Sequence, residues 1–244
     1  MLVYLYDGSF EGLLTSVYEA YYVERPGNIV KEEHYMMDLL DRTVHVDTDV
    51  EKASKVSGAI LEKLSNDVFI HVLYAYLAED KESAMAIYEF LRYAFKAGSK
   101  VIDFESHDKV SKLLKLSRGV TRESHRLLGL IRFMKLDNGI YYCRFEPTYN
   151  LLTLLAPHFS NRMADQSWVI HDVKRGIAAF YDQKKWYIND LEGNIDASLA
   201  GDEQLFQDLW KEYFKRIAIK ERINPKLQRQ MMPKKYWKHL IEIE

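Results

Sequence analysis

The strongest constraint on the fold is the stretch Gly139–Asn189, in which short strand-like runs surround one leucine-rich helix. β-branched and aromatic residues dominate four runs, and such side chains pack well on a pleated surface. These runs are Ile140–Phe145, Trp168–His171, Ile177–Tyr181 and Trp186–Ile188. Between the first two, Leu151–Met163 has the composition of a helix. We therefore predict that this stretch is the sheet of the protein and that the rest of the chain packs around it.

Helical periodicity dominates the remainder of the chain. The apolar residues of Phe10–Tyr22 repeat at helical spacing after Ser9, which is a good N-cap. Further helices are predicted over 50–64, Val68–Ala78, Ser83–Lys96, Thr121–Leu136 and Gln204–Lys220, and short strands over Leu2–Tyr6 and Thr43–Val46. The prediction is a single α+β domain over residues 1–244, with a helix-rich N-terminal half, a small, mostly antiparallel sheet and a long basic C-terminal helix. The alternative is a subdivision into an acidic helical part (1–108) and a basic sheet-containing part (109–244).

Cysteine content limits the chemistry that this chain can support by itself. Cys143 is the one cysteine, so a disulfide framework, a thiolate zinc site or an iron–sulfur cluster cannot be built within one chain. The 8 histidines lack paired metal-ligand spacing, and we expect no metal and no cofactor. The first residues lack the pattern of a signal peptide, and no apolar run is long enough to span a membrane. We therefore expect a cytoplasmic protein without membrane contact.

Charge is distributed unevenly along the chain. Residues 1–108 hold 20 Asp/Glu against 10 Lys/Arg, whereas residues 109–244 hold 16 against 24. An asymmetry of this kind is typical of a protein whose basic half faces a polyanion or an acidic partner. It is equally consistent with two halves that attract one another within the fold.

The basic half contains the candidate nucleic-acid-binding residues. Guanidinium groups bind phosphate through two parallel hydrogen bonds, and aromatic side chains among cations can stack on bases. The candidates are Arg118, Arg122, Arg126, Arg132, Arg162, Lys174, Arg175, Lys215, Arg222 and Arg229. Tyr236 and Trp237 lie among the C-terminal lysines and are either stacking platforms or core residues that dock the C-terminus. For the arginines, the alternative is a solvated helix face with local salt bridges.

Candidate catalytic groups lie in and beside the predicted sheet. His158, His171 and Asp172 could supply acid–base groups if they converge on one cleft with nearby arginines. Since neighbouring residues of a strand point to opposite faces, His171 and Asp172 are not expected to pair with each other. Asp7 lies between a strand and a helix, where a capping role is the first interpretation and a catalytic role the alternative.

Four stretches carry a family resemblance over nearly the whole chain. They are YLYDGSFEGLL, SRGVTRESHRLLGLIRFMKL, YYCRFEPTYNLLTLLAPHFSNRM with WVIHDVKRG, and WKEYFKRIAIKERINPKLQRQMMPKKYW. The chain resembles an uncharacterised bacterial family labelled "probable DNA metabolism protein", classed as domain of unknown function 4130. Its members resemble companions of a radical SAM protein of DNA modification or repair, and a similar domain occurs fused to a uracil-DNA-glycosylase-like domain. The motif positions carried over are Asp7, His125, Arg126, Arg132, His158, Arg162, Asp172, Arg175, Arg222, Asn224, Tyr236 and Trp237.

Three functions follow as hypotheses. The first is a nucleic-acid-binding accessory protein in DNA repair or modification, which holds DNA while a radical SAM partner does the chemistry. The second is an enzyme that acts on DNA or nucleotides in a His/Asp/Arg cleft. The third is a protein adaptor, without nucleic-acid contact, whose acidic half docks the radical SAM partner. The first requires that folding gathers the cations of the second half into one surface.

Overall fold

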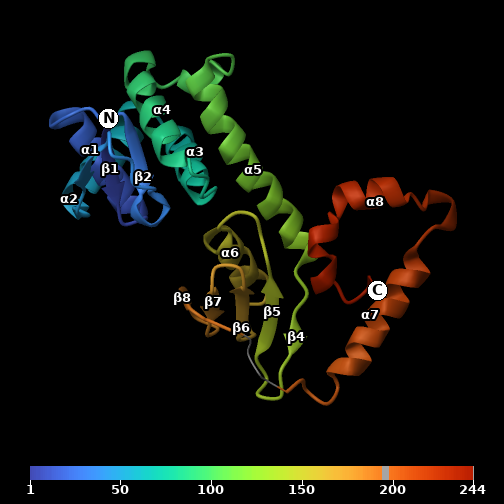
Figure 1. The fold of residues 1–244 in the computed structure, drawn as a ribbon. Coiled ribbons are helices and arrows are strands. Elements are labelled where there is room, and N and C mark those ends of the chain that lie inside the picture. Colours follow the sequence, from blue (N-terminus) through green and yellow to red (C-terminus); the bar gives the residue numbers. More distant parts are fainter. Residues whose placement is uncertain (194–197, 244) are drawn as a thin grey trace. The chain divides into compact units, whose positions relative to one another are not determined.

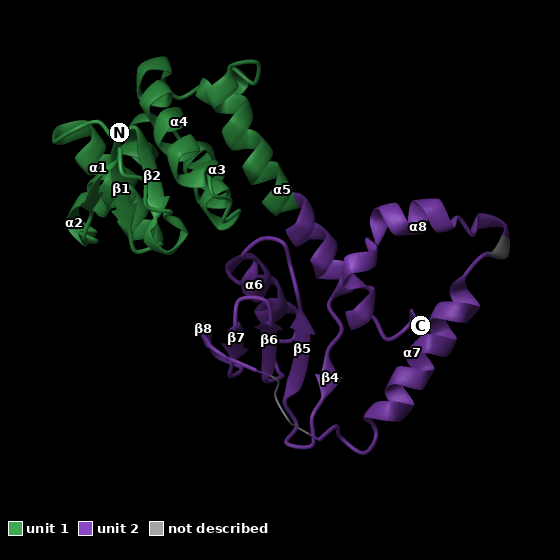
Figure 2. Ribbon diagram, in the orientation of Figure 1, with its two compact units in different colours: residues 1–121 green, residues 122–244 purple. Residues whose placement is uncertain are grey.

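The protein has a mixed α+β fold with two separate sheets, seen in a computed structural model that describes residues 1–193 and 198–243 (Figure 1). The chain divides into two compact units, an N-terminal unit (residues 1–121) and a C-terminal unit (residues 122–244) (Figure 2). The division falls inside helix α5 (Asp108–Leu130) and not at residue 108, where the charge changes sign. The α+β class is confirmed, while the single-domain assignment stays a prediction.

The N-terminal unit is built on a three-stranded parallel sheet that we did not predict. Strand β1 (Leu2–Tyr6) lies in the centre, between β2 (Asn28–Lys31) and β3 (Arg42–His45). Helix α1 (Phe10–Tyr22) connects β1 to β2, and a helical crossover of this kind returns the chain so that the next strand runs parallel. The prediction that one sheet organises the whole protein is therefore wrong, because the N-terminal unit has its own.

Helices complete the N-terminal unit, and side-chain caps begin the first three of them. Ser9 Oγ accepts a hydrogen bond from Gly12 N at 2.9 Å, Asp49 caps the second helix and Ser65 the third. The buried apolar faces of these helices, including Leu13 and Ile60, form one core. The remaining elements are α2 (Val50–Lys63), α3 (Asn66–Leu77), α4 (Ser83–Ala97) and the short 3₁₀ helices η1 (Glu32–His34) and η2 (Val101–Asp103).

The C-terminal unit contains the predicted sheet as five strands in sequential order. They are β4 (Met134–Lys135), β5 (Tyr141–Phe145), β6 (Trp168–Asp172), β7 (Ile177–Tyr181) and β8 (Trp186–Asp190). Strands β5 and β6 run parallel because helix α6 (Leu152–Arg162) connects them, while the other three pairs are antiparallel. Across both sheets the pairing is partly parallel, which corrects the mostly antiparallel prediction.

The region after the sheet is also different from the prediction. Helix α7 (Glu203–Ile217) ends before Lys220, and its acidic side chains match its basic ones, so it is not a long basic helix. Its large apolar residues lie largely in solvent, including Leu205 and Leu209 at 60% and 56% exposed. The chain continues through η3 (Lys220–Arg222), α8 (Pro225–Met231) and η4 (Lys234–His239).

Helix α5 begins earlier and ends earlier than the predicted Thr121–Leu136. The Thr121 hydroxyl does not cap a helix start but donates to the Ser117 carbonyl at 3.0 Å, one turn back in the same helix. The last predicted residues form β4 instead. Of all the helices in the described residues, none is both long and apolar enough to cross a bilayer.

Candidate functional site

The central feature of the C-terminal unit is a buried carboxylate on α5. Val120, Glu123 and Leu127 follow one another at helical spacing, so Glu123 belongs to the apolar face of a helix whose other face carries arginines. Its side chain is only 5% exposed. A charge in this position is tolerated only when several hydrogen bonds replace its water.

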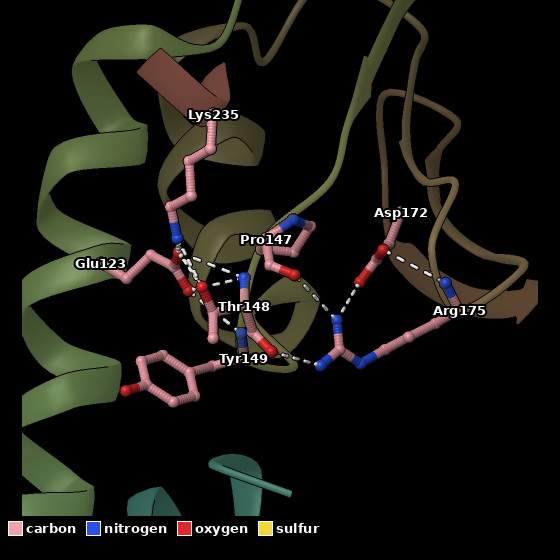
Figure 3. Close-up of polar contacts among 7 residues, drawn as sticks. All are labelled: Glu123, Pro147, Thr148, Tyr149, Asp172, Arg175 and Lys235. Atoms are coloured by element: carbon pink, nitrogen blue, oxygen red, sulfur yellow. Dashed lines mark hydrogen bonds and ion pairs between the residues drawn. The ribbon is translucent and has the colours of Figure 1, made fainter. Parts of the chain in front are cut away.

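Five donors from two distant segments satisfy Glu123, and Figure 3 draws the residues that supply all of them except Tyr236. In the loop after β5, the Thr148 and Tyr149 amides donate to the same carboxylate oxygen at 2.9 and 3.0 Å, and the Thr148 hydroxyl donates to the other at 2.9 Å. From η4, Lys235 Nζ and the Tyr236 hydroxyl both donate to Glu123. Lys235 Nζ also donates to the Thr148 hydroxyl. Glu123 thus ties the C-terminal segment and the β5–α6 loop to α5.

The protonation states follow from this network. Burial alone would raise the pKa of Glu123, but the hydrogen bonds from Lys235, Tyr236 and the loop amides outweigh burial and hold that pKa below its usual value. Burial and the neighbouring Glu123 carboxylate raise the pKa of Tyr236, which therefore stays protonated and can donate. The cluster is a charged Glu–Lys pair with a neutral phenol at neutral pH.

Arg175 holds the same loop from its other side (Figure 3). Its guanidinium donates to the Thr148 carbonyl at 3.0 Å and to Asp172 Oδ2 at 2.8 Å, and it approaches the Pro147 carbonyl at 3.5 Å. Asp172 is fully buried, and this burial raises its pKa while Arg175 opposes the rise. The pair is a structural clamp in which the arginine positions the loop.

Exposed cations surround the buried carboxylate. Arg122 and Arg126 lie one turn apart on the exposed side of α5, next to the buried face that bears Glu123. Arg126 is close enough that its charge acts on the Tyr236 hydroxyl of η4. Lys235 is 46% exposed despite its pair with Glu123, and Lys234 beside it lies in solvent. We call Arg122, Arg126, Lys234 and Lys235 the α5–η4 basic patch.

Several predicted nucleic-acid-binding residues are instead neutralised. Arg118 pairs with Glu105 at 2.6 Å within the N-terminal unit. Arg132 forms two hydrogen bonds with the fully buried Glu242, at 3.2 and 2.6 Å. Arg175 forms an ion pair with Asp172. These three side chains have acidic partners, as Lys235 has, so they carry less uncompensated positive charge than the sequence alone suggests.

Other candidates remain exposed but scattered over different elements. Arg229 donates to the Pro225 carbonyl one turn back in α8. Among the described residues, the exposed cations of the prediction without a carboxylate partner are Arg122, Arg126, Arg162, Lys174, Lys215, Arg222 and Arg229. Within the C-terminal unit the balance is 20 Lys/Arg against 16 Asp/Glu, because four cations of the basic half belong to the N-terminal unit.

The catalytic candidates do not form a pair in the sheet. His171 is fully buried, and its Nε2 must donate to the Leu191 carbonyl at 3.0 Å, so its Nδ1 accepts from the Tyr142 hydroxyl at 2.8 Å. Burial lowers the pKa of His171, which keeps the ring neutral. Asp172 binds Arg175, and His158 packs its ring on Phe159 in α6. Both nitrogens of His171 thus have structural partners.

The remaining motif positions mostly have local structural roles. The Asp7 carboxylate accepts hydrogen bonds from the Ser9 amide and hydroxyl and from the Thr48 hydroxyl, as a turn and capping residue does. Asn224 caps α8, the Trp237 indole donates to the Met232 carbonyl, and His125 is exposed on α5. No group of three or more histidine, cysteine or acidic side chains is placed to hold a metal ion among the residues that the structure describes.

Sequence reasoning missed Glu123, Thr148 and Lys235, which make the core of the site. The available signal was the position of Glu123, the single acid on the apolar face of a helix, since a buried acid requires partners. Its partners lie 25 and 112 residues further along the chain, and no local pattern identifies them.

Comparison with known proteins identifies the family of this chain but gives no activity. The family model DUF4130, described as a domain of unknown function, matches residues 81–242, which include the whole site. The search of the curated proteins found no match. Membership of the DUF4130 family, which the sequence motifs indicated, is thereby confirmed over residues 81–242, and the stretch YLYDGSFEGLL lies outside the matched range.

Proposed function

We propose that this chain, which belongs to the DUF4130 family of unknown function, binds the backbone of nucleic acid through its C-terminal unit. The observation that carries the proposal is the α5–η4 basic patch. The contact between Lys235 and Glu123, which lie 112 residues apart in the chain, brings η4 against the part of α5 that bears Arg122 and Arg126. Because a phosphate backbone is a regular row of negative charges, binding requires cations gathered in this way.

The buried carboxylate beneath the patch supports this role. Glu123 fixes Lys235 through a direct ion pair, so less side-chain entropy is lost when Lys235 meets a phosphate. Arg122 and Arg126 have no carboxylate partner among the described residues, and their guanidinium forks suit phosphate oxygens. In this proposal Glu123, Thr148 and Arg175 are positioning residues, and the four cations make the contacts.

The biological context follows from the family resemblance. We propose that the protein is an accessory factor in DNA repair or modification, that DNA is its ligand, and that a radical SAM protein is its partner. Cys143 is the one cysteine of the chain and is fully buried, with burial raising the pKa of its thiol to about 12. A cysteine that binds an iron–sulfur cluster needs an accessible thiolate, which Cys143 does not offer. Any iron–sulfur cluster would therefore belong to the partner.

The direct test compares two double variants in the full-length protein. Arg122→Gln/Arg126→Gln removes two cations of the patch, and Lys184→Gln/Lys185→Gln removes two exposed cations from the β7–β8 turn of the same unit. Fluorescence anisotropy with labelled single- and double-stranded DNA at about 50 mM salt measures the affinity. We expect the patch variant to bind at least about tenfold more weakly and the turn variant to bind like the wild type.

Two results would contradict the proposal. Equal losses in both variants would indicate attraction by overall charge without a site. Absence of binding at low salt would remove the nucleic-acid function altogether, because electrostatic binding is strongest there.

An adaptor function has its own supporting observation. Helix α7 exposes Leu205, Leu209, Tyr213 and Ile217, each more than half exposed, and an apolar stripe of this kind is typical of a surface that meets another protein. Co-purification with the radical SAM partner tests this alternative. Association that survives Arg122→Gln/Arg126→Gln but not Leu209→Asp would favour the adaptor over the nucleic-acid-binding function.

A further inference from the structure

The C-terminal unit contains a groove with a volume of about 680 Å³ beside β4 and α7. Aromatic side chains from separate segments line it, namely Phe133, Tyr141, Phe159, Phe206 and Trp210. Phe206 and Trp210 are 57% and 37% exposed, so their rings are accessible from the groove's open side. Accessible aromatic surface in a concave site is the usual setting for binding a flat ligand.

Trp210 is held in position within this groove. The Arg132 guanidinium lies 5.2 Å from the centre of the Trp210 ring, and the buried Glu242 fixes that guanidinium. Burial raises the pKa of Glu242, but hydrogen bonds, chiefly from Arg132 and to a smaller extent from the Trp210 indole, hold that pKa below its usual value. A ring that is already fixed loses little entropy when a ligand stacks on it.

Cationic groups lie at the rim of the groove. Arg162, at the end of α6, lines the groove, is exposed and has no carboxylate partner among the described residues. Lys135 is 38% exposed and only loosely paired, 4.0 Å from Asp202. The groove therefore combines stacking surfaces with a free guanidinium, as a ligand with a planar ring and a phosphate requires.

The groove continues the face of α5 that bears the basic patch. Arg122, Arg126 and Gly129 stand at helical spacing on one side of α5, and Gly129 lines the groove. At the rise of a helix, Arg122 lies about 10 Å along the axis from Gly129. A polyanion that follows the arginines is thereby directed to the aromatic side chains.

We propose that this groove receives an unstacked base of single-stranded nucleic acid whose backbone lies on the α5–η4 basic patch. The inference rests on the proposed function and deepens it by naming the ligand as single-stranded. Bases within a duplex are covered by their neighbours, whereas a single strand can place a ring against Phe206 or Trp210. Arg162 contacts the phosphate next to the inserted base.

The test separates base binding from backbone binding in the full-length protein. One probe is an oligothymidylate of roughly 12 nucleotides, and the other is an abasic strand with the same number of phosphates. We expect the wild type to bind the oligothymidylate about 5- to 100-fold more tightly than the abasic strand.

Phe206→Ser should bring this ratio close to one and leave the affinity for the abasic strand unchanged. Leu205→Ser is the matched control, because Leu205 is exposed on the same helix but does not line the groove, and it should keep the wild-type ratio. Trp210→Leu should repeat the effect of Phe206→Ser, while Arg162→Gln should weaken binding of the oligothymidylate more than that of duplex DNA.

The outcomes also separate this inference from the proposed function. Equal affinities of wild type for the two strands, with Arg122→Gln/Arg126→Gln still weakening both, would overturn the base site and leave backbone binding intact. If neither Phe206→Ser nor Trp210→Leu changed the ratio of the affinities for the oligothymidylate and the abasic strand, the base site would likewise be overturned. The groove would then bind another ligand, such as an apolar protein segment. If the wild type bound neither the oligothymidylate nor the abasic strand, both the base site and the proposed function would be overturned.

Discussion

At the scale of single residues, the account depends on Glu123. An acid on the apolar face of α5 collects five donors, and this arrangement explains why the loop after β5 and the C-terminal segment meet at one place. The sequence reveals such a residue only as an exception to the helical pattern. It does not reveal Thr148 or Lys235, because contacts between distant segments leave no local periodicity.

Glu123→Gln should lower the free energy of unfolding by about 3 kcal/mol. Lys235 loses its counter-charge, and the NH2 group of the glutamine replaces an oxygen that accepts hydrogen bonds. Chemical denaturation followed by circular dichroism measures the free energy of unfolding. Glu212→Gln serves as the control, since Glu212 meets only Arg216 on an exposed helix face, and its stability should match the wild type. A fully stable Glu123→Gln protein would show that the network is dispensable.

Stability should also depend on pH through Glu123. Its pKa is lower in the folded state than in the unfolded chain, so its contribution is fully present above the unfolded value of about 4.3 and is lost as pH falls through the folded pKa. The stability difference between wild type and Glu123→Gln should be constant from neutral pH to about pH 5 and shrink at lower pH. Unfolding curves at several pH values measure it, and a difference that grows on acidification would contradict the assignment.

His171 and Asp172 show what the alternation of a strand can predict. Their side chains were expected on opposite faces of β6, and they bind different partners, Tyr142 and Leu191 for His171 and Arg175 for Asp172. That these partners use both His171 nitrogens could not be derived from the sequence, because Tyr142 and Leu191 come from other segments. The hypothesis of a His/Asp cleft therefore lacks support from the geometry.

At the scale of elements, local signals were reliable where they were strong. The cap Ser9 begins a helix as expected, and all four strand-like runs of Gly139–Asn189 are strands. The parallel pairing of β5 with β6 was predictable, since a helix lies between them, but the crossover was not considered. Helix α7 was placed correctly, yet its apolar face is exposed because periodicity does not say what covers it.

The C-terminal segment should depend on one further ion pair. Glu242→Gln should release Arg132 and Trp210 and loosen the last turns, because the fully buried carboxylate connects them. Hydrogen exchange of the amides in 236–243 measures the effect, and we expect faster exchange there than in the wild type. Glu221→Gln, at an exposed position in η3, is the control. Unchanged exchange in the Glu242→Gln protein would show that other contacts hold the segment.

At the scale of the whole molecule, the distribution of charge is the property that the sequence indicated most clearly. Ion pairs in the folded chain alter how much of that charge remains unpaired. Folding neutralises Arg118, Arg132 and Arg175 with acids of their own units. Other exposed cations remain spread over several elements, and the α5–η4 basic patch is the group on which the proposed function rests. The expectation of one broad basic surface is therefore narrowed, in our proposal, to this patch.

The measurement that tests this account most directly is the salt dependence of single-stranded DNA binding. The logarithm of the affinity should fall linearly with the logarithm of salt concentration, and Arg122→Gln/Arg126→Gln should reduce the slope by about 1.4, since two phosphate contacts are lost. Lys184→Gln/Lys185→Gln should keep the wild-type slope. An identical slope in all three proteins would contradict a phosphate site at the patch.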